Sequence, residues 1–290
     1  MEILVALRPH QWLKNSLLFV PLFTSQTNLD MAFLKLAMLG FVGFSMVCSG
    51  NYIANDLIDF ESDQGVVYKS QKPIASGKIR KEPAIFLATL LLVLGLVLCW
   101  YASSNFLLLT IIYLCLGLLY SKFLKRIPQL DIVILVLFYE IRIFAGGALF
   151  DLTISFWLII FSFTVFSSLA FVKKCSKAAI QYSQYLEDSP DYLKRSESNY
   201  LSQFGISYAV LSLLTFALYL NSEEIRIIYT EPRLLWFLIP LLQFLLLRTW
   251  SATLSGRMHY DPIVFILRDR ITCICLCLML FVVGVIEKVN

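Results

Sequence analysis

Apolar residues occur along the chain in long continuous runs, not in the alternation typical of half-buried strands. A helix that crosses a bilayer needs about 20 mostly apolar residues. Runs of this kind, separated by polar or proline-containing breaks, predict nine spans at about 14–25, 32–55, 83–101, 105–121, 131–149, 155–172, 204–220, 233–249 and 271–287. We therefore predict an all-α membrane protein, a bundle of nine transmembrane helices that forms a single integral-membrane domain over residues 1–290.

Composition supports this fold class. Hydrophobic residues make up 59% of the 290 positions, charged residues only 15%, and the mean hydropathy is +0.75. These values exclude an ordinary soluble enzyme, a disordered chain and a nucleic-acid-binding module. The net charge of +4 does not favour nucleic acid, because the basic residues are divided among the connections between spans. The seven cysteines lie mostly in apolar runs, where we expect small packing residues and no metal cluster.

The basic residues predict an orientation. With nine spans, nineteen of the twenty-four lysines and arginines fall on one side, four on the other and one inside a span. This asymmetry places the N-terminus and the two longest connections, about 56–82 and 173–203, in the cytoplasm. Arg8-Pro9 interrupts the first apolar stretch, so we expect that stretch to be kept as a span and not removed as a signal peptide.

Three aspartates form the strongest chemical signal. Asp56, Asp59 and Asp63 stand at i, i+3 and i+7, on one face of a helix that continues span 2 into the cytoplasm. Asn55 lies on the adjoining stripe. Like charges at this spacing repel one another unless a cation neutralises them, and Mg²⁺ prefers oxygen ligands. We predict that these aspartates bind Mg²⁺; the alternative is a solvated helix end.

Basic residues near the acidic stripe are candidate phosphate ligands. Lys69 and Lys72 follow it directly, in a segment whose serine and glycine allow close backbone approach. Further candidates are chosen because they lie at the basic ends of spans or inside a span: Lys14, Tyr120, Lys125 and Arg142. The alternatives are a topological role for the loop lysines, an interfacial role for Tyr120, and an ion pair with another span for Arg142.

Several motifs resemble one family. Asn55-Asp56-x-x-Asp59-x-x-x-Asp63, followed by Lys72-Pro73-Ile74-Ala75-Ser76-Gly77, resembles the first signature of the UbiA-type membrane prenyltransferase superfamily. The similarity is greatest to its polyprenyl-phosphate phosphoribosyltransferase branch. The segments that carry it include Leu7-Arg8-Pro9-His10-Gln11-Trp12-Leu13-Lys14-Asn15, Leu119-Tyr120-Ser121-Lys122-Phe123-Leu124-Lys125, Arg142-Ile143-Phe144-Ala145-Gly146-Gly147 and Phe171-Val172-Lys173-Lys174.

The resemblance implies a fold and an activity. It implies a UbiA-type bundle in the bacterial plasma membrane, with a cytosol-facing active-site cavity and Mg²⁺ held by Asp56, Asp59 and Asp63. The implied reaction transfers 5-phosphoribosyl from phosphoribosyl pyrophosphate to a polyprenyl phosphate, whose charge would lie near Lys173 and Lys174. The chain departs from the branch at Val66-Val67, where a His-Pro pair is usual, and at Lys69-Ser70-Gln71-Lys72, where arginines are usual.

Two other functions remain open at this point. A prenyltransferase would move an isoprenyl group from its diphosphate to an aromatic or lipid acceptor. Against it, the connection after span 6 is basic where a second acidic motif is expected. A transporter would place charges near the bilayer midplane in both halves of the chain, whereas most charges here lie at one membrane face. The sequence also leaves a homo-oligomer open.

Overall fold

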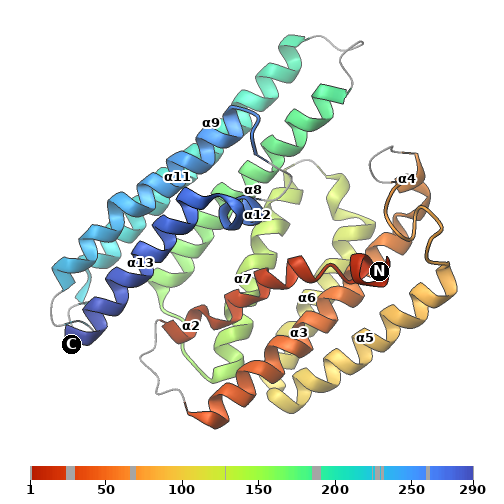
Figure 1. The fold of residues 1–290 in the computed structure, drawn as a ribbon, viewed down its shortest axis with the longest axis horizontal. Coiled ribbons are helices and arrows are strands. Elements are labelled where there is room, and N and C mark those ends of the chain that lie inside the picture. Colours follow the sequence, from red (N-terminus) through yellow and green to blue (C-terminus); the bar gives the residue numbers. More distant parts are fainter. Residues whose placement is uncertain are drawn as a thin grey trace. The chain divides into compact units, whose positions relative to one another are not determined.

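The computed structural model describes residues 2–23, 30–65, 70–127, 129–184, 191–223, 225, 229, 232–258 and 262–289. All regular secondary structure in these ranges is helical, which confirms the predicted fold class (Figure 1). Within the part of the chain that the structure describes, seven helical segments are long and apolar enough to cross a membrane: Met31–Ile58, Lys81–Ala102, Ser104–Lys122, Leu130–Phe150, Phe156–Lys177, Asn199–Leu220 and Pro232–Leu254. They correspond to seven of the nine expected spans. The protein is therefore a multi-pass membrane protein.

The other two expected spans have a different form. The first comprises a 3₁₀ helix, η1 (Pro9–Phe19), and a short helix, α2 (Val20–Phe23), preceded by α1 (Glu2–Leu7). Pro21 has no backbone N–H to donate, so a regular α-helix is weakened there. The last expected span is α13 (Arg270–Val289), whose apolar part is shorter, Arg270–Gly284, and which follows α12 (Pro262–Arg268).

The connection expected after span 6 is largely helical. α8 runs from Phe156 to Gln184, and α9 runs from Asp191 to Leu220. Lys173 and Lys174, which the sequence places at the start of the connection 173–203, therefore lie on a helix that continues the preceding span. The difference arises because hydropathy detects only the apolar part of a helix, whereas backbone hydrogen bonding carries the helix on past it.

The chain divides into two compact units, Met1–Ile154 and Ser155–Asn290. In the first, α3 (Met31–Ile58) lies beside α5 (Lys81–Ala102), and α6 (Ser104–Lys122) is followed by α7 (Leu130–Phe150) (Figure 1). Gly146 of α7 lies against η1, because a Cβ there would come within 2.0 Å of the Leu18 carbonyl oxygen. Buried Phe44, Phe106 and Leu18 belong to the core of this unit.

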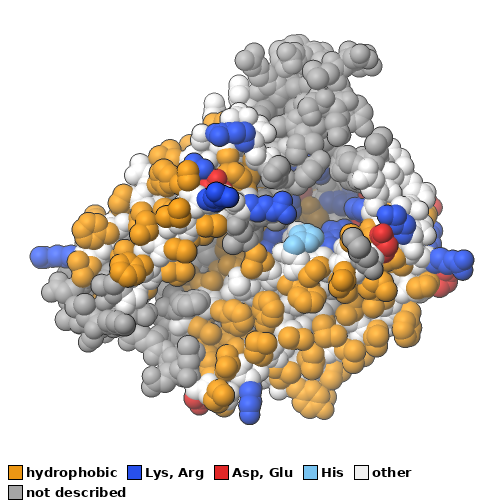
Figure 2. Space-filling view, viewed as in Figure 1, with side chains coloured by type: hydrophobic (Ala, Val, Ile, Leu, Met, Phe, Trp, Pro, Cys, Tyr) orange, Lys and Arg blue, Asp and Glu red, His pale blue; other side chains and the backbone are white. Residues whose placement is uncertain are grey.

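The second unit contains α8, α9, η3 (Pro232–Phe237), α11 (Leu238–Leu254), α12 and α13. α8 and α9 pack along each other, and α11 contacts both. Leu220, Ile225, Leu235 and Leu238 form a buried cluster at one end of these helices. Apolar side chains cover broad parts of the visible surface (Figure 2), as expected for helices whose outer faces contact lipid and not water.

Candidate functional site

The acidic stripe lies where α3 gives way to α4 (Phe60–Gln64), with Asp59 between the two helices. The turn hardly interrupts the helical path: the Asp59 N–H donates to the Asn55 carbonyl at 2.9 Å, and the Asp63 N–H donates to the Asp59 carbonyl at 2.8 Å. The helical register predicted from the sequence is thus nearly kept through the stripe.

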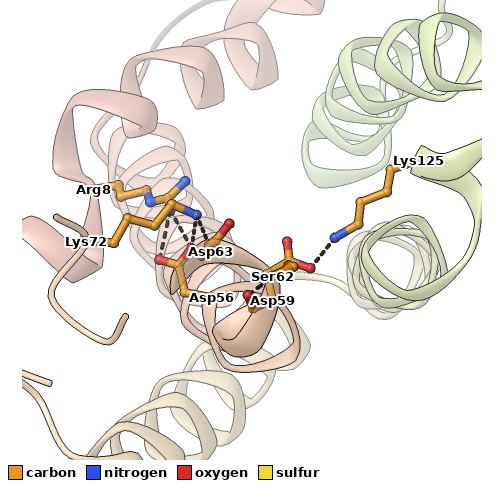
Figure 3. Close-up of polar contacts among 7 residues, drawn as sticks. All are labelled: Arg8, Asp56, Asp59, Ser62, Asp63, Lys72 and Lys125. Atoms are coloured by element: carbon orange, nitrogen blue, oxygen red, sulfur yellow. Dashed lines mark hydrogen bonds and ion pairs between the residues drawn. The ribbon is translucent and has the colours of Figure 1, made fainter. Parts of the chain in front are cut away.

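Asp56 and Asp63 form one half of the site (Figure 3). Both are buried, with 3% and 1% of their surface exposed. The Lys72 ammonium bridges them, with Nζ 2.9 Å from Asp56 Oδ1 and 2.6 Å from Asp63 Oδ2. Nη2 of Arg8 donates to both carboxylate oxygens of Asp56 at 2.8 Å. Two basic side chains therefore neutralise two carboxylates that burial would otherwise leave too costly to keep charged.

Asp59 faces a different partner. Its carboxylate is paired with Lys125, which lies on the short 3₁₀ helix η2 (Leu124–Arg126), on the other side of the stripe from Arg8 and Lys72 (Figure 3). Among the described residues, no three His, Cys, Asp or Glu side chains are grouped closely enough to hold one metal ion. The geometry thus brings Asp56 and Asp63 together and leaves Asp59 beside Lys125.

Lys72 is held in place by the loop that carries it. The Ser76 N–H donates to the Lys72 carbonyl at 2.8 Å, the Ile79 N–H donates to the Pro73 carbonyl at 2.9 Å, and Ile74 is buried. Burial lowers the pKa of Lys72, but the charge of Asp56 and the hydrogen bonds to Asp56 and Asp63 raise it more. The pKa therefore lies above the ordinary lysine value of 10.5, and Lys72 stays charged at neutral pH.

Arg8 was not among the site residues predicted from the sequence. Arg8 immediately precedes Pro9, the first residue of η1. Its backbone φ is 52°, in the left-handed region. The guanidinium lies 5.3 Å from the centre of the Tyr52 ring, one turn before Asp56 on α3. Two features of the sequence mark Arg8, its position before a proline and its place in the N-terminal motif, but neither specifies a partner 48 residues away.

Arg142 lies in a different buried cluster of the same unit. It is 3% exposed, and its Nε donates to Asn15 Oδ1 at 3.1 Å while Nη2 donates to the Tyr113 hydroxyl at 2.8 Å. Nη1 donates to the Phe138 carbonyl. Asn15 in turn donates to Ser45 Oγ at 2.9 Å. All three guanidinium nitrogens thus contact protein groups, and these contacts join η1 to α3, α6 and α7.

The remaining predicted residues are distributed over both units. Lys14 is 8% exposed on η1, and the Tyr120 ring on α6 meets the Phe138 ring edge-on at 5.8 Å. Lys173 and Lys174 are half-buried on α8, in the second unit. Lys69 lies outside the described residues.

Comparison with known proteins identifies relatives of this chain. The UbiA prenyltransferase family model matches residues 16–259. The chain is 33% identical over 268 residues to the uncharacterized protein y4nM of Sinorhizobium fredii, covering 91% of this chain and 52% of that protein. It is 26% identical over 275 residues to a decaprenyl-phosphate phosphoribosyltransferase of Mycobacterium tuberculosis, covering 92% of this chain and 87% of that protein. The chain spans about half the length of y4nM.

A solved structure shares the fold. A UbiA homolog from Archaeoglobus fulgidus bound to DMAPP and Mg²⁺ superimposes with a TM-score of 0.69 at 17% identity, over 100% of both chains. At that identity the likeness concerns the fold alone. The family match, over residues 16–259, covers most of the chain and includes the acidic stripe and the Lys72 loop. The chain therefore belongs to the UbiA prenyltransferase family.

Proposed function

We propose that this protein transfers the 5-phosphoribosyl group of phosphoribosyl pyrophosphate to a polyprenyl phosphate and releases pyrophosphate, in a reaction that depends on Mg²⁺. The observation that carries the proposal is the buried pair of Asp56 and Asp63, bridged by Lys72 and contacted by Arg8. Buried carboxylates surrounded by basic side chains suit a substrate that arrives as a diphosphate with a divalent cation. Relatives named decaprenyl-phosphate phosphoribosyltransferase, at 26% to 34% identity, favour this donor and acceptor.

The carboxylates suit Mg²⁺. Lys72 already bridges two of them as a cation, so the pair accommodates positive charge between its oxygens. Mg²⁺ usually takes one or two carboxylates and fills its remaining positions with water and substrate phosphates. We assign Asp56 and Asp63 as the residues that would hold the metal, and Asp59 would join them only after leaving Lys125. When bound, the metal would neutralise the negative charge that develops on the departing pyrophosphate.

The basic residues then have a clear task. Arg8 and Lys72 are paired with Asp56 and Asp63, and Lys125 is paired with Asp59. If the carboxylates held a metal, these side chains would be free to contact the phosphate oxygens of the donor. Arginine grips phosphate with two parallel donors, whereas each lysine acts as a point charge. Positive charge from three separate elements would hold the diphosphate against the acidic stripe.

The transfer requires no strong base. The bond between ribose C1 and the pyrophosphate oxygen breaks, and its electron pair leaves with pyrophosphate. A phosphate oxygen of the acceptor forms the new bond to C1. Because that oxygen is already anionic, no proton must be removed from it. We assign Lys14, Asn55, Lys69 and Tyr120 to the donor side and Lys173 and Lys174 to the acceptor phosphate. Arg142, whose nitrogens all contact protein groups, we assign to positioning η1.

The site is proposed to face the cytoplasm. Nineteen of the twenty-four lysines and arginines fall on the side of the membrane that carries the acidic stripe when the nine spans are counted. Positive residues accumulate on the cytoplasmic side of membrane proteins. Phosphoribosyl pyrophosphate, being soluble and highly charged, would reach the site from that side, whereas the polyprenyl tail of the acceptor would stay in the bilayer.

Prenyl transfer is the second candidate, because the Archaeoglobus fulgidus homolog was solved with DMAPP and Mg²⁺. The deciding experiment offers purified protein two substrate pairs with Mg²⁺ and identifies lipid products by mass spectrometry. The pairs are phosphoribosyl pyrophosphate with polyprenyl phosphate, and polyprenyl diphosphate with an aromatic acid. A polyprenyl-phosphoryl-phosphoribose product supports the proposal, whereas a prenylated aromatic reverses the donor assignment.

Matched variants connect the activity to the site. Asp56→Asn and Asp63→Asn should each reduce turnover by more than about a hundredfold, since each removes a charge that the metal needs. Asp151→Asn is the control: Asp151 is exposed at the end of α7 in a left-handed conformation that asparagine also tolerates. A fully active Asp56→Asn variant would overturn the assignment of the metal site.

A further inference from the structure

An apolar groove of about 590 Å³ lies on the second unit, between α9 and α11. Ala209, Val210 and Leu213 line the wall from α9, and Leu246 and Leu247, together with the polar Gln243, line the wall from α11. The volume is in the range of small-molecule sites, about 300–1,000 Å³. Both helices belong to candidate membrane spans, so the medium around the groove is lipid and not water.

The floor of the groove is built and fixed. Trp250 is 5% exposed, and its Nε1 donates to Ser168 Oγ on α8 at 2.9 Å. The Ser168 hydroxyl then donates to the Gly205 carbonyl on α9, also at 2.9 Å. Gly205 leaves room for the indole, because a Cβ there would lie 2.3 Å from Trp250 Cζ2. The ring is thus seated against α9, and the space beside it forms the groove.

One end of the groove is polar and positively charged. Ser251 and Ser255 line it there, where α11 ends at Leu254. Gly256, with φ of +70°, turns the chain, and Nε of the exposed Arg257 donates to Ser255 Oγ at 2.9 Å. An apolar channel that leads to hydroxyls and a guanidinium matches the plan of a lipid with an anionic head group.

We propose that this groove binds one anionic glycerophospholipid of the bilayer, with an acyl chain along Trp250 and the phosphate at Arg257 and Ser255. A guanidinium forms charge-assisted hydrogen bonds with phosphate. In a zwitterionic lipid the head group's own cation competes for that phosphate, so an anionic lipid is preferred. No carboxylate is found among the described lining residues, so the groove offers nothing to hold the metal that a group transfer needs. It is a binding site for a resident lipid and not a second reaction site.

The test is native mass spectrometry of delipidated protein titrated with phosphatidylglycerol or phosphatidylcholine of identical acyl chains. We expect one phosphatidylglycerol to be retained per chain in preference to phosphatidylcholine. Arg257→Gln should weaken phosphatidylglycerol binding about fivefold and leave phosphatidylcholine unchanged. Arg233→Gln is the matched control, because Arg233 is an exposed arginine at the opposite end of the same span. Equal loss in both variants would overturn the head-group assignment.

A second pair of variants tests the groove itself. Val210→Trp fills it and should abolish retention of the lipid, whereas Leu211→Trp adds the same bulk at a neighbouring exposed position that does not line the groove. Thermal unfolding of both variants verifies that they fold. Undiminished retention in Val210→Trp overturns the proposal. The proposal is also overturned if Val210→Trp loses an oligomer and not a lipid from its mass spectrum, since a second copy of the chain would then be the occupant. Tighter binding of polyprenyl phosphate than of phosphatidylglycerol would overturn it as well.

Discussion

Arg8 contacts both carboxylate oxygens of Asp56 through a single guanidinium nitrogen, 2.8 Å from each, across 48 positions of the sequence. The contact joins the start of η1 to the C-terminal end of α3, which we predict to face the cytoplasm. Because Arg8 neutralises a carboxylate proposed to bind metal, it competes with the metal for Asp56 and then assists the donor. This double role leads to effects of opposite sign.

Arg8→Gln should therefore bind the divalent cation more tightly and the donor more weakly. Without phosphoribosyl pyrophosphate, affinity for Mn²⁺, a probe for Mg²⁺, should rise about fivefold, because a competing charge is removed. Affinity for the donor should fall about tenfold, because a charged hydrogen bond to phosphate is lost. Electron paramagnetic resonance titration measures the first, and competition with a labelled donor measures the second.

Arg80→Gln provides the control for this variant, since Arg80 is exposed and precedes α5 in the same unit. Both affinities should stay within twofold of the unmodified protein. If metal and donor affinity both fall in Arg8→Gln, Arg8 only orders the carboxylates. The proposal that Arg8 competes with the metal for Asp56 and then contacts the donor would be wrong.

Lys72→Met should destabilise the protein in a way that metal reverses. Asp56 and Asp63 would lose the cation between them, and we expect a cost of about 2 kcal/mol in the free energy of unfolding, because one partner of a largely buried ion pair is removed. Adding Mg²⁺ should restore more stability to this variant than to the unmodified protein. Thermal unfolding in detergent, with and without Mg²⁺, measures both effects.

Lys78→Met is the comparison for Lys72→Met, because Lys78 is 55% exposed and pairs with Glu2 at the surface. Such pairs contribute about 0–1 kcal/mol, so the change should be small and independent of Mg²⁺. An Mg²⁺ effect of equal size in both variants would show that the ion acts elsewhere.

Asp269 should give the second unit an acid-sensitive contribution to stability. Hydrogen bonds from Arg248, at 2.6 and 2.7 Å, lower the pKa of Asp269 well below its ordinary value of 3.8, and hydrogen bonds from Thr272 lower it further. A group whose pKa is lowered on folding stabilises the protein above its unfolded pKa, and this contribution is lost as the pH falls through the folded value.

The prediction follows from that sign. Between pH 5 and pH 7, Asp269→Asn should be less stable than the unmodified protein by a constant amount. Below about pH 4 the two melting temperatures should begin to approach each other, because the unfolded chain takes up a proton at Asp269 that the folded protein still excludes. Melting curves from pH 3 to pH 7 test this in an acid-tolerant detergent. A difference that persists unchanged at pH 3 would mean that Asp269 acts only as a neutral cap for α13.

Gly146→Ala should displace η1. The new Cβ would meet the Leu18 carbonyl at 2.0 Å, a backbone atom that a side-chain rotation cannot move away. We expect a loss of about 2 kcal/mol in stability, typical of overpacking, and weaker donor binding because Arg8 lies at the start of η1. Gly284→Ala on α13, where nothing lies within 4 Å of the new Cβ, should be neutral or slightly stabilising. Equal effects of the two substitutions on donor binding would contradict the role of η1.

The sequence specified the membrane spans and the acidic stripe well. Runs of apolar residues set seven spans, because only a helix satisfies its own backbone in lipid. The spacing of Asp56, Asp59 and Asp63 placed them on adjacent turns, and the register survives the break at Asp59. Both results depend on local periodicity. The end of span 6 was not predicted correctly from hydropathy, because α8 continues as a polar helix past its apolar part.

The sequence alone thus determined that this is an all-helical, multi-pass membrane protein with a run of carboxylates at one helix end. Only the tertiary structure decided which cations meet them: Arg8 meets Asp56 across 48 positions, and Lys125 meets Asp59 across 66. It also seated Trp250 on Ser168, 82 positions away. The physical reason is that apolar runs and helical spacing are encoded within a few turns of chain, whereas these pairings depend on how separate helices pack, which no local pattern records.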